Sequence, residues 1–180
     1  MTNPGTLRDP NLEAFDKTMR ELPAGVIETS PALVVTVGAR ACAIPLRHVA
    51  ETMRPLPIES VAGMPAFIRG VSVIRGAPVL VLDLRALLEP GEPEPSLAFA
   101  RLVVVKLGER RLAVGVDAVV GLANLGAAQL EELPPILGDV SAALVESIGT
   151  RDAQLLVVLR ATRLVPEPVW ATLARAEATG

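Results

Sequence analysis

The sequence predicts a mainly β protein of two small barrels, each with about four or five strands, and a short helix at either end. Short aliphatic runs recur at regular spacing with turn residues between them, which is typical of small barrels. The strand pattern of the first half also returns in the second half, which indicates an internal duplication. Because each half is too small for a large core, the halves should pack on each other or exchange strands.

Composition places the chain among folded proteins. A hydrophobic fraction of 51% and a mean hydropathy of +0.46 exclude intrinsic disorder. No run of about 18 apolar residues is free of charge, so we expect no membrane insertion. The first residues lack the basic and apolar regions of a signal peptide, and the single cysteine cannot build a disulfide framework. We therefore expect a cytoplasmic protein.

Charge and aromatic content argue against a nucleic-acid partner. The net charge is −3, and the chain has three Phe, one Trp and no Tyr on which bases could stack. Fifteen of the 17 basic residues are arginine, which favours planar contacts with other proteins.

Residues 1–30 form an expected N-terminal extension with a short amphipathic helix. Asp9-Pro10 is a helix start signal, and Pro-Ala-Gly at 23–25 is a stop signal. A helix of this length is not stable alone, so it should dock on the body or fold on a partner. Its apolar face would be formed by Leu12, Phe15, Met19 and Leu22.

Two similar hairpins are predicted at 31–45 and 101–116. The first turns at Gly38-Ala39-Arg40 and the second at Gly108. A shift of 70 residues (108 − 38) superimposes them. The shift matches Val34 with Val104, Val35 with Val105, Arg40 with Arg110, Ala43 with Ala113 and Val49 with Val119.

The repeat continues more loosely beyond each hairpin. Residues 79–88 resemble 155–164 at an offset of 76 (155 − 79), and residues 79–82 do not alternate, so both faces of that strand should be covered. A solvated loop at 88–99 should join barrel one, mainly 31–88, to barrel two, mainly 100–165. A C-terminal helix within 166–180 follows, with Val169, Trp170 and Leu173 as its apolar face.

Motifs for catalysis or metal binding are missing from the sequence. It has no phosphate loop and no nucleophile elbow, and one His with one Cys cannot build a zinc or iron site. Cys42 and His48 suggest a thiolate–imidazole pair, but we interpret them as a buried cysteine and a helix-surface histidine. We expect no enzyme and no cofactor.

Acidic side chains have plain structural interpretations. Asp83 and Asp117 each follow an apolar run, where they could cap a turn or bind an arginine such as Arg85. The remaining carboxylate pairs are expected to be solvated, with the second pair in a short helical piece. These pairs are Glu92 with Glu94 and Glu131 with Glu132.

An arginine and a glycine interrupt the aliphatic stretch at 70–85. Arg75-Gly76, followed by Ala77-Pro78, predicts a tight reversal or bulge between two strands, with Arg75 exposed at its shoulder. Such an arginine either solvates the surface or acts as a rigidly held contact on a protein-binding face.

The stretch MPAFIRGVSVIRGAPVLVLDLR, residues 64–85, resembles the signature of the CheW family, the coupling proteins of bacterial chemosensory arrays. The resemblance covers about residues 31–165. Upstream, Val49 and Glu51 resemble the family's V-x-E segment, and downstream Val116, Asp117 and Val119 resemble its V-D-x-V stretch. The matching signature residues are Pro65, Phe67, Ile68, Arg69, Gly70, Val71, Arg75, Gly76, Asp83, Leu84 and Arg85.

The resemblance implies two intertwined five-stranded barrels without catalytic activity. It implies an adaptor that couples chemoreceptor tips to the regulatory domain of a CheA-type histidine kinase at membrane-associated receptor arrays. Arg75 with Gly70 and Gly76 would lie at a receptor or kinase contact, and Asp117 with Val119 would form a second, kinase-facing surface. The partner-binding residues implied in this way are Arg75, Gly70, Gly76, Val49, Glu51, Arg69, Asp83, Arg85, Asp117 and Val119.

The chain departs from the family pattern at three places. Val73 stands where the family has asparagine, Leu80 replaces a common strand proline, and Ala113 replaces an expected glycine. These departures leave two alternatives open. One is a CheW-like adaptor for surface motility or gene regulation, and the other is an unrelated ligand-binding barrel of the oligonucleotide-binding type.

Overall fold

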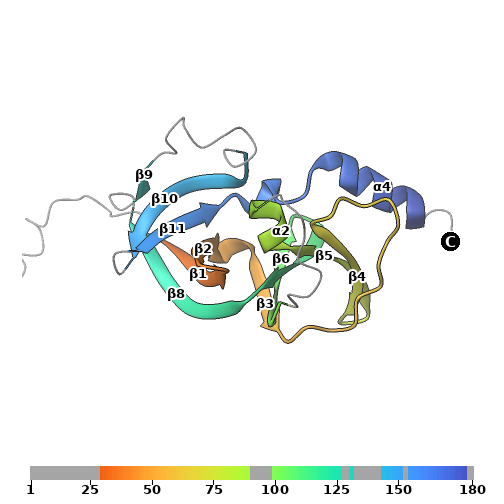
Figure 1. Ribbon diagram of the computed structural model, residues 1–180, viewed down its shortest axis with the longest axis horizontal. Helices are drawn as coiled ribbons and strands as arrows, with labels where there is room; N and C mark the ends of the chain where they lie inside the picture. The colour runs from red at the N-terminus through yellow and green to blue at the C-terminus, as the bar shows by residue number, and fades with distance from the viewer. Residues whose placement is uncertain (1–28, 90–98, 127–129, 132–142, 152–153, 178–180) are drawn as a thin grey trace, which may run out of the picture.

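The computed structural model describes residues 29–89, 99–126, 130–131, 143–151 and 154–177, which form two β-sheets (Figure 1). Sheet A has the order β8 (Ala118–Gly126), β1 (Thr29–Val37), β2 (Arg40–Pro45), β11 (Gln154–Leu159), β10 (Val145–Arg151) and β9 (Leu130–Glu131). Sheet B has the order β3 (Val49–Met53), β6 (Arg101–Leu107), β7 (Arg110–Val116), β5 (Ala77–Asp83) and β4 (Ile68–Ile74).

Each sheet takes a hairpin from the other half of the chain. Hairpin β1–β2 lies in sheet A among strands of the second half, and hairpin β6–β7 lies in sheet B among strands of the first half. Both inserted hairpins end in a parallel pairing, β2 with β11 and β7 with β5. The predicted mainly β fold with two intertwined units is therefore confirmed, and the two-residue β9 adds a sixth strand to sheet A.

The strand exchange leaves three apolar cores. A large core lies between the sheets, and a small core lies on the inner face of each sheet. Val79 and Val81 enter the sheet B core while Leu80 and Leu82 enter the shared core, so the prediction that both faces of this strand are covered is confirmed. The sheet B core consists of Ile74, Val79, Val81, Phe99, Leu102, Val104 and Ala113.

Residues matched by the duplication occupy equivalent places in these cores. Val34 and Val104 each lie in the small core of their sheet, and Val35 and Val105 both lie in the shared core. The offset of the later strands needs a correction. The hairpin-closing pairs Ile74↔Ala77 and Arg151↔Gln154 give 77 (151 − 74), because an offset of 76 would match a buried residue with an exposed one.

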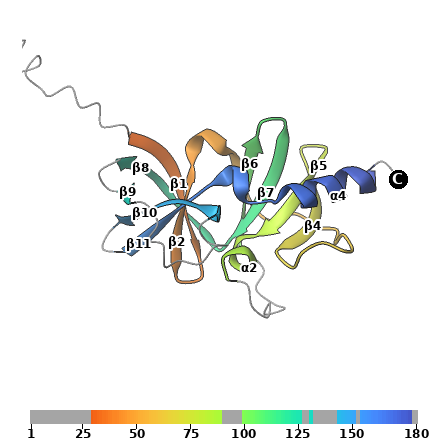
Figure 2. The same cartoon turned by 90° about the horizontal axis from the view of Figure 1, so that it is seen from above.

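Short helices sit between and beside the sheets (Figure 2). A 3₁₀ turn, Leu46–His48, carries the chain from sheet A to sheet B, and α2 (Leu84–Leu88) lies between the sheets. A second 3₁₀ turn, Ala161–Arg163, leads to α4 (Glu167–Glu177) beside sheet B. Val169 of α4 is buried and Trp170 and Leu173 pack against the shared core, which confirms the predicted apolar face.

Several expectations fall on other parts of the chain. The N-terminal helix and the pair Glu92 and Glu94 lie outside the described residues. Glu131 lies in strand β9, so the expected helical piece at this position was wrong: pairing with β10 fixes the backbone as extended. Within the described ranges, no helix is both long and apolar enough to cross a membrane.

Candidate functional site

Arg75 and Gly76 form the two-residue turn between β4 and β5. Ile74 and Ala77 pair on either side of it, and φ is +55° at Arg75 and +78° at Gly76. Two consecutive positive φ values define a type I′ turn, which matches the right-handed twist of the strands. Arginine is uncommon in this conformation. The predicted tight turn is confirmed, and Arg75 lies within the turn rather than at its shoulder.

Arg75 contacts Glu51 of β3 through a bidentate ion pair. Its Nη2 lies 2.7 Å from Oε2, and its Nε lies 3.3 Å from Oε1 and 3.2 Å from Oε2. β3 and β4 are the two edge strands of sheet B in pairing order, so this contact closes the curled sheet at one end. The Arg75 side chain remains 72% exposed, whereas that of Glu51 is only 24% exposed.

Glu51 lies at the mouth of the sheet B core. It pairs with Val104, and opposed residues in a β pair share a face, so its side chain sits on the side of this core. Arg111 shares a face with buried Ala113 on β7, because strand residues two apart point the same way. We call Glu51, Arg75 and Arg111 the charged mouth.

The charged mouth favours the ionised carboxylate. Hydrogen bonds from Arg75, followed by the positive charges of Arg75 and Arg111, hold the pKa of Glu51 below its ordinary value despite some loss of hydration. The same contact raises the pKa of the Arg75 guanidinium. At neutral pH the mouth therefore presents a fixed pair of opposite charges with the cation outermost.

Gly70 positions a neighbouring loop. Glu59 exchanges backbone hydrogen bonds with Val71 of β4, each 2.8 Å long, and a Cβ at Gly70 would lie 2.0 Å from the Glu59 carbonyl oxygen. Ser72 donates a further hydrogen bond to the carbonyl of Pro57. Gly70 thus allows residues 54–67 to pair along the open edge of β4, and we assign it a shaping role.

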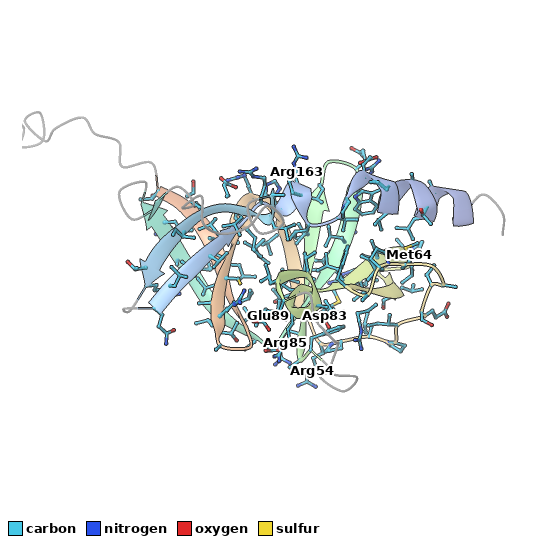
Figure 3. All side chains as sticks on the ribbon, turned by 45° about the horizontal axis from the view of Figure 1, so that its top comes forward. Arg54, Met64, Asp83, Arg85, Glu89 and Arg163 are labelled. Atoms are coloured by element: carbon cyan, nitrogen blue, oxygen red, sulfur yellow. The ribbon has the colours of Figure 1, made fainter. Side chains whose placement is uncertain are left out.

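A second polar cluster lies at the junction of the two sheets, around α2 (Figure 3). Asp83 caps α2 by accepting hydrogen bonds from the backbone N–H groups of Arg85 and Ala86, and Arg69 lies 3.8 Å from its other oxygen. The expectation that Asp83 caps a local structure is confirmed. Its carboxylate is only 14% exposed, so little of it is available to a partner.

Asp117 lies where the chain crosses from sheet B to sheet A. Its carboxylate accepts hydrogen bonds from the Arg85 guanidinium and, at 2.7 Å, from the N–H of Gly38 in the β1–β2 turn. Its own N–H donates to the carbonyl of Thr36. The expectation that Asp117 binds an arginine such as Arg85 is confirmed, and these contacts tie the sheets together at a half-exposed point.

The ten residues implied by the resemblance therefore fall into four places. Arg75, Gly76 and Glu51 meet at the charged mouth; Arg69, Asp83, Arg85 and Asp117 meet at the sheet junction; Gly70 shapes the β4 edge. Val49 and Val119 are half-buried against the shared core. They occupy equivalent positions beside bulges in β3 and β8.

Sequence reasoning missed Arg111 and two further ion pairs. Arg110 makes a bidentate contact with Glu167, at 2.9 and 3.0 Å, and Arg40 lies 3.2 Å from Glu89. The alternation along β7 was the available signal for Arg111. No local signal links Arg110 to Glu167, because the two residues are 57 positions apart.

The described residues offer little for catalysis. No group of three or more His, Cys, Asp and Glu side chains in these ranges could hold a metal ion. Cys42 is buried as expected, and burial raises the pKa of its thiol to about 11. His48 lies in the 3₁₀ turn between the sheets. The small cores of both sheets are filled by buried side chains rather than by ligand-sized space.

Comparison with known proteins identifies the same architecture. The model of the CheW-like domain family matches residues 31–169. Protein FrzA of Myxococcus xanthus is 33% identical over 122 residues, which are 65% of this chain and 74% of FrzA. The chemotaxis protein CheW of Klebsiella aerogenes is 23% identical over 136 residues, covering 74% of this chain and 80% of that protein.

A solved structure shares the fold. The crystal structure of the scaffolding protein TtCheW from Thermoanaerobacter tengcongensis superimposes with a TM-score of 0.67 at 22% sequence identity. The match covers 77% of this chain and 88% of that chain.

Proposed function

The chain belongs to the CheW-like family, and we propose from this that it is a non-enzymatic adaptor coupling chemoreceptor tips to a CheA-type histidine kinase. The family consists of scaffold proteins without catalytic activity. The chain would act in a chemosensory array at the cytoplasmic side of receptor-bearing membranes.

The charged mouth is the observation that supports a protein-binding role most strongly. The bond to Glu51 and the type I′ turn fix the position of Arg75, so little side-chain entropy remains to be lost when a partner binds. The guanidinium still exposes most of its surface. Rigid arginines of this kind are enriched among residues that dominate binding energies.

The mechanism we propose is positional. An adaptor without chemistry can change kinase output only by binding receptor and kinase conformations with different affinities. Two intertwined sheets joined at Asp117 and Arg85 offer separate surfaces on one stiff body. Contact made at one end of the molecule can thereby fix the position of a partner at the other end.

Isothermal titration against the regulatory domain of the cognate CheA-type kinase tests the proposal. Wild type should bind saturably, and Arg75→Glu should weaken binding about tenfold or more, because two acidic groups would then face each other. The exchange Arg75→Glu with Glu51→Arg restores the ion pair but reverses the outer charge, so it should not restore affinity.

Arg101→Ala is the matched control. Arg101 is an exposed arginine on the same sheet that donates to its neighbour's backbone carbonyl, and its removal should leave affinity unchanged. If Arg75→Glu binds like wild type, the mouth does not face the kinase, and the same series is repeated with a receptor-tip fragment. Loss of neither interaction would overturn the role of Arg75.

A coupler for surface motility or gene regulation is the alternative. Val73, which stands in place of the family's asparagine, is 66% exposed two residues before Arg75 and changes the chemistry beside the contact. Val73→Asn should shift the preference among receptor tips from different pathways. Equal binding of all tips by wild type would remove this alternative.

A further inference from the structure

The duplication produces two equivalent grooves, one on each sheet. Groove B, of about 330 Å³, is lined on sheet B by Val71, Pro78, Leu80 and Arg110. Groove A, of about 460 Å³, is lined on sheet A by Ile148, Leu155, Val157 and Arg40. The β10–β11 positions follow those of β4–β5 by 77 residues, and Arg110 follows Arg40 by 70, so the two sets correspond one to one.

Helix α4 shows what groove B accepts. Trp170, Leu173 and Ala174 of α4 form the wall of this groove (Figure 2). Glu167, in the first turn of α4, binds Arg110 through both oxygens, and the Arg110 guanidinium lies 5.1 Å from the centroid of the Trp170 ring. The fitting pattern is thus an acidic residue followed three and six positions later by large apolar ones.

Groove A keeps the same chemistry in a more open form. Arg40 faces Glu89 at 3.2 Å, and both side chains are about half exposed, at 51% and 48%. Leu155 is 58% exposed, whereas Leu80 at the floor of groove B is buried. In the described part of the chain, Leu88 at the end of α2 is the helical residue that reaches groove A.

The sequence explains why the first repeat does not supply a second α4. After Glu167 the second repeat continues as a helix-forming segment, whereas after Glu89 the first repeat continues as Pro-Gly-Glu-Pro-Glu-Pro. Prolines at 93 and 95 would each remove a helical hydrogen bond and clash with the preceding turn. The duplication therefore left groove A without a helix of its own type.

We propose that groove A docks an amphipathic helix of a partner protein, bound as α4 is bound in groove B. The helix carries an acidic residue that reaches Arg40, in exchange with Glu89, and apolar residues three and six positions later that cover Leu155 and Ile148. This surface lies on a different sheet from the charged mouth and does not depend on which partner the mouth binds.

The probe is a peptide of residues 166–177, held helical by a lactam between positions 171 and 175, since a free helix of this length is marginal in water. Fluorescence anisotropy with the full-length chain should show saturable binding. Leu155→Glu should raise Kd about tenfold or more, because it buries a carboxylate against the apolar face of the helix. The exposed position of Leu155 keeps the variant folded.

Leu122→Glu is the matched control, since Leu122 is a 63% exposed leucine on β8 of the same sheet. Binding lost with Leu155→Glu and kept with Leu122→Glu supports the proposal. The absence of binding, or binding insensitive to Leu155→Glu, overturns it. If sedimentation shows that wild type self-associates and Leu155→Glu is monomeric, a second copy fills the groove and the partner-helix proposal is wrong.

Discussion

At the scale of single residues, backbone geometry explains positions that side-chain chemistry does not. Gly70, Gly76 and Gly115 lie in or beside the family signature segments, yet each meets a different demand. Gly76 supplies a positive φ, Gly70 leaves room for the Glu59 carbonyl, and Gly115 leaves room for the Phe99 ring, which a Cβ would approach to 2.4 Å. The shift of this glycine from position 113 to 115 thus follows from Phe99.

Gly70→Ala should destabilise the fold strongly. The new methyl group would lie 2.0 Å from a backbone oxygen that pairs with β4, so the loop or the strand must move. We expect a loss of about 3 kcal/mol in the free energy of unfolding, measured by urea denaturation.

Gly76→Ala provides the comparison. It shares the positive φ, but its Cβ would meet nothing within 4 Å, so only the left-handed backbone is penalised, by about 1 kcal/mol. Equal losses for the two variants would contradict the steric role of Gly70.

The Cys42 thiol should make stability fall at high pH. Burial raises its pKa from 9.0 to about 11 in the folded chain, against a smaller opposing effect of Arg40. The unfolded chain therefore loses this proton first, and the stabilisation present below pH 9 is lost as pH rises from 9 to 11. Thermal unfolding of wild type and Cys42→Ala across this range should show a steeper decline for wild type, and parallel curves would refute the assignment.

At the scale of elements, caps and clasps fix short segments that could not hold their own shape. α2 has only five residues, and Asp83 satisfies two of its free N–H groups. Its partner Arg85 reaches Asp117, so the helix also aligns the two sheets. Arg110 performs a similar task for α4 through Glu167 and Trp170.

Asp83→Ala should cost about 1 kcal/mol in unfolding free energy through loss of the cap. Asp83→Asn retains an oxygen that can accept both hydrogen bonds while it removes the charge facing Arg69. It should therefore remain near wild type in chemical denaturation. A loss of the same size in both variants would show that the ion pair, rather than the cap, stabilises this end of β5.

At the scale of the whole molecule, local patterns predicted the strands but not their partners. The hairpins at 31–45 and 101–116 were predicted because their turns and aliphatic runs are local signals. The contact of Arg75 with Glu51 could not be predicted without the closure of sheet B, which brings its edge strands together. Glu131 was placed in a helix because its strand depends on a distant partner, β10.

The duplication connects these scales. It placed matched residues in matched cores, yet the charged mouth exists on one sheet only: the positions equivalent to Glu51 and Arg111 are Gly121 and Ala41. The two halves therefore share a fold and differ in what they present. This asymmetry is what an adaptor with distinct partners requires.

Kinase output in a reconstituted system tests coupling most directly. A CheA-type kinase would be combined with a receptor cytoplasmic fragment on vesicles, with or without the chain, and its autophosphorylation rate measured. We predict that the chain changes the rate only when the receptor is present, and that Arg75→Glu, folded by circular dichroism, removes the change. An identical rate with and without the wild-type chain, at concentrations that saturate the kinase domain in titration, would contradict the account.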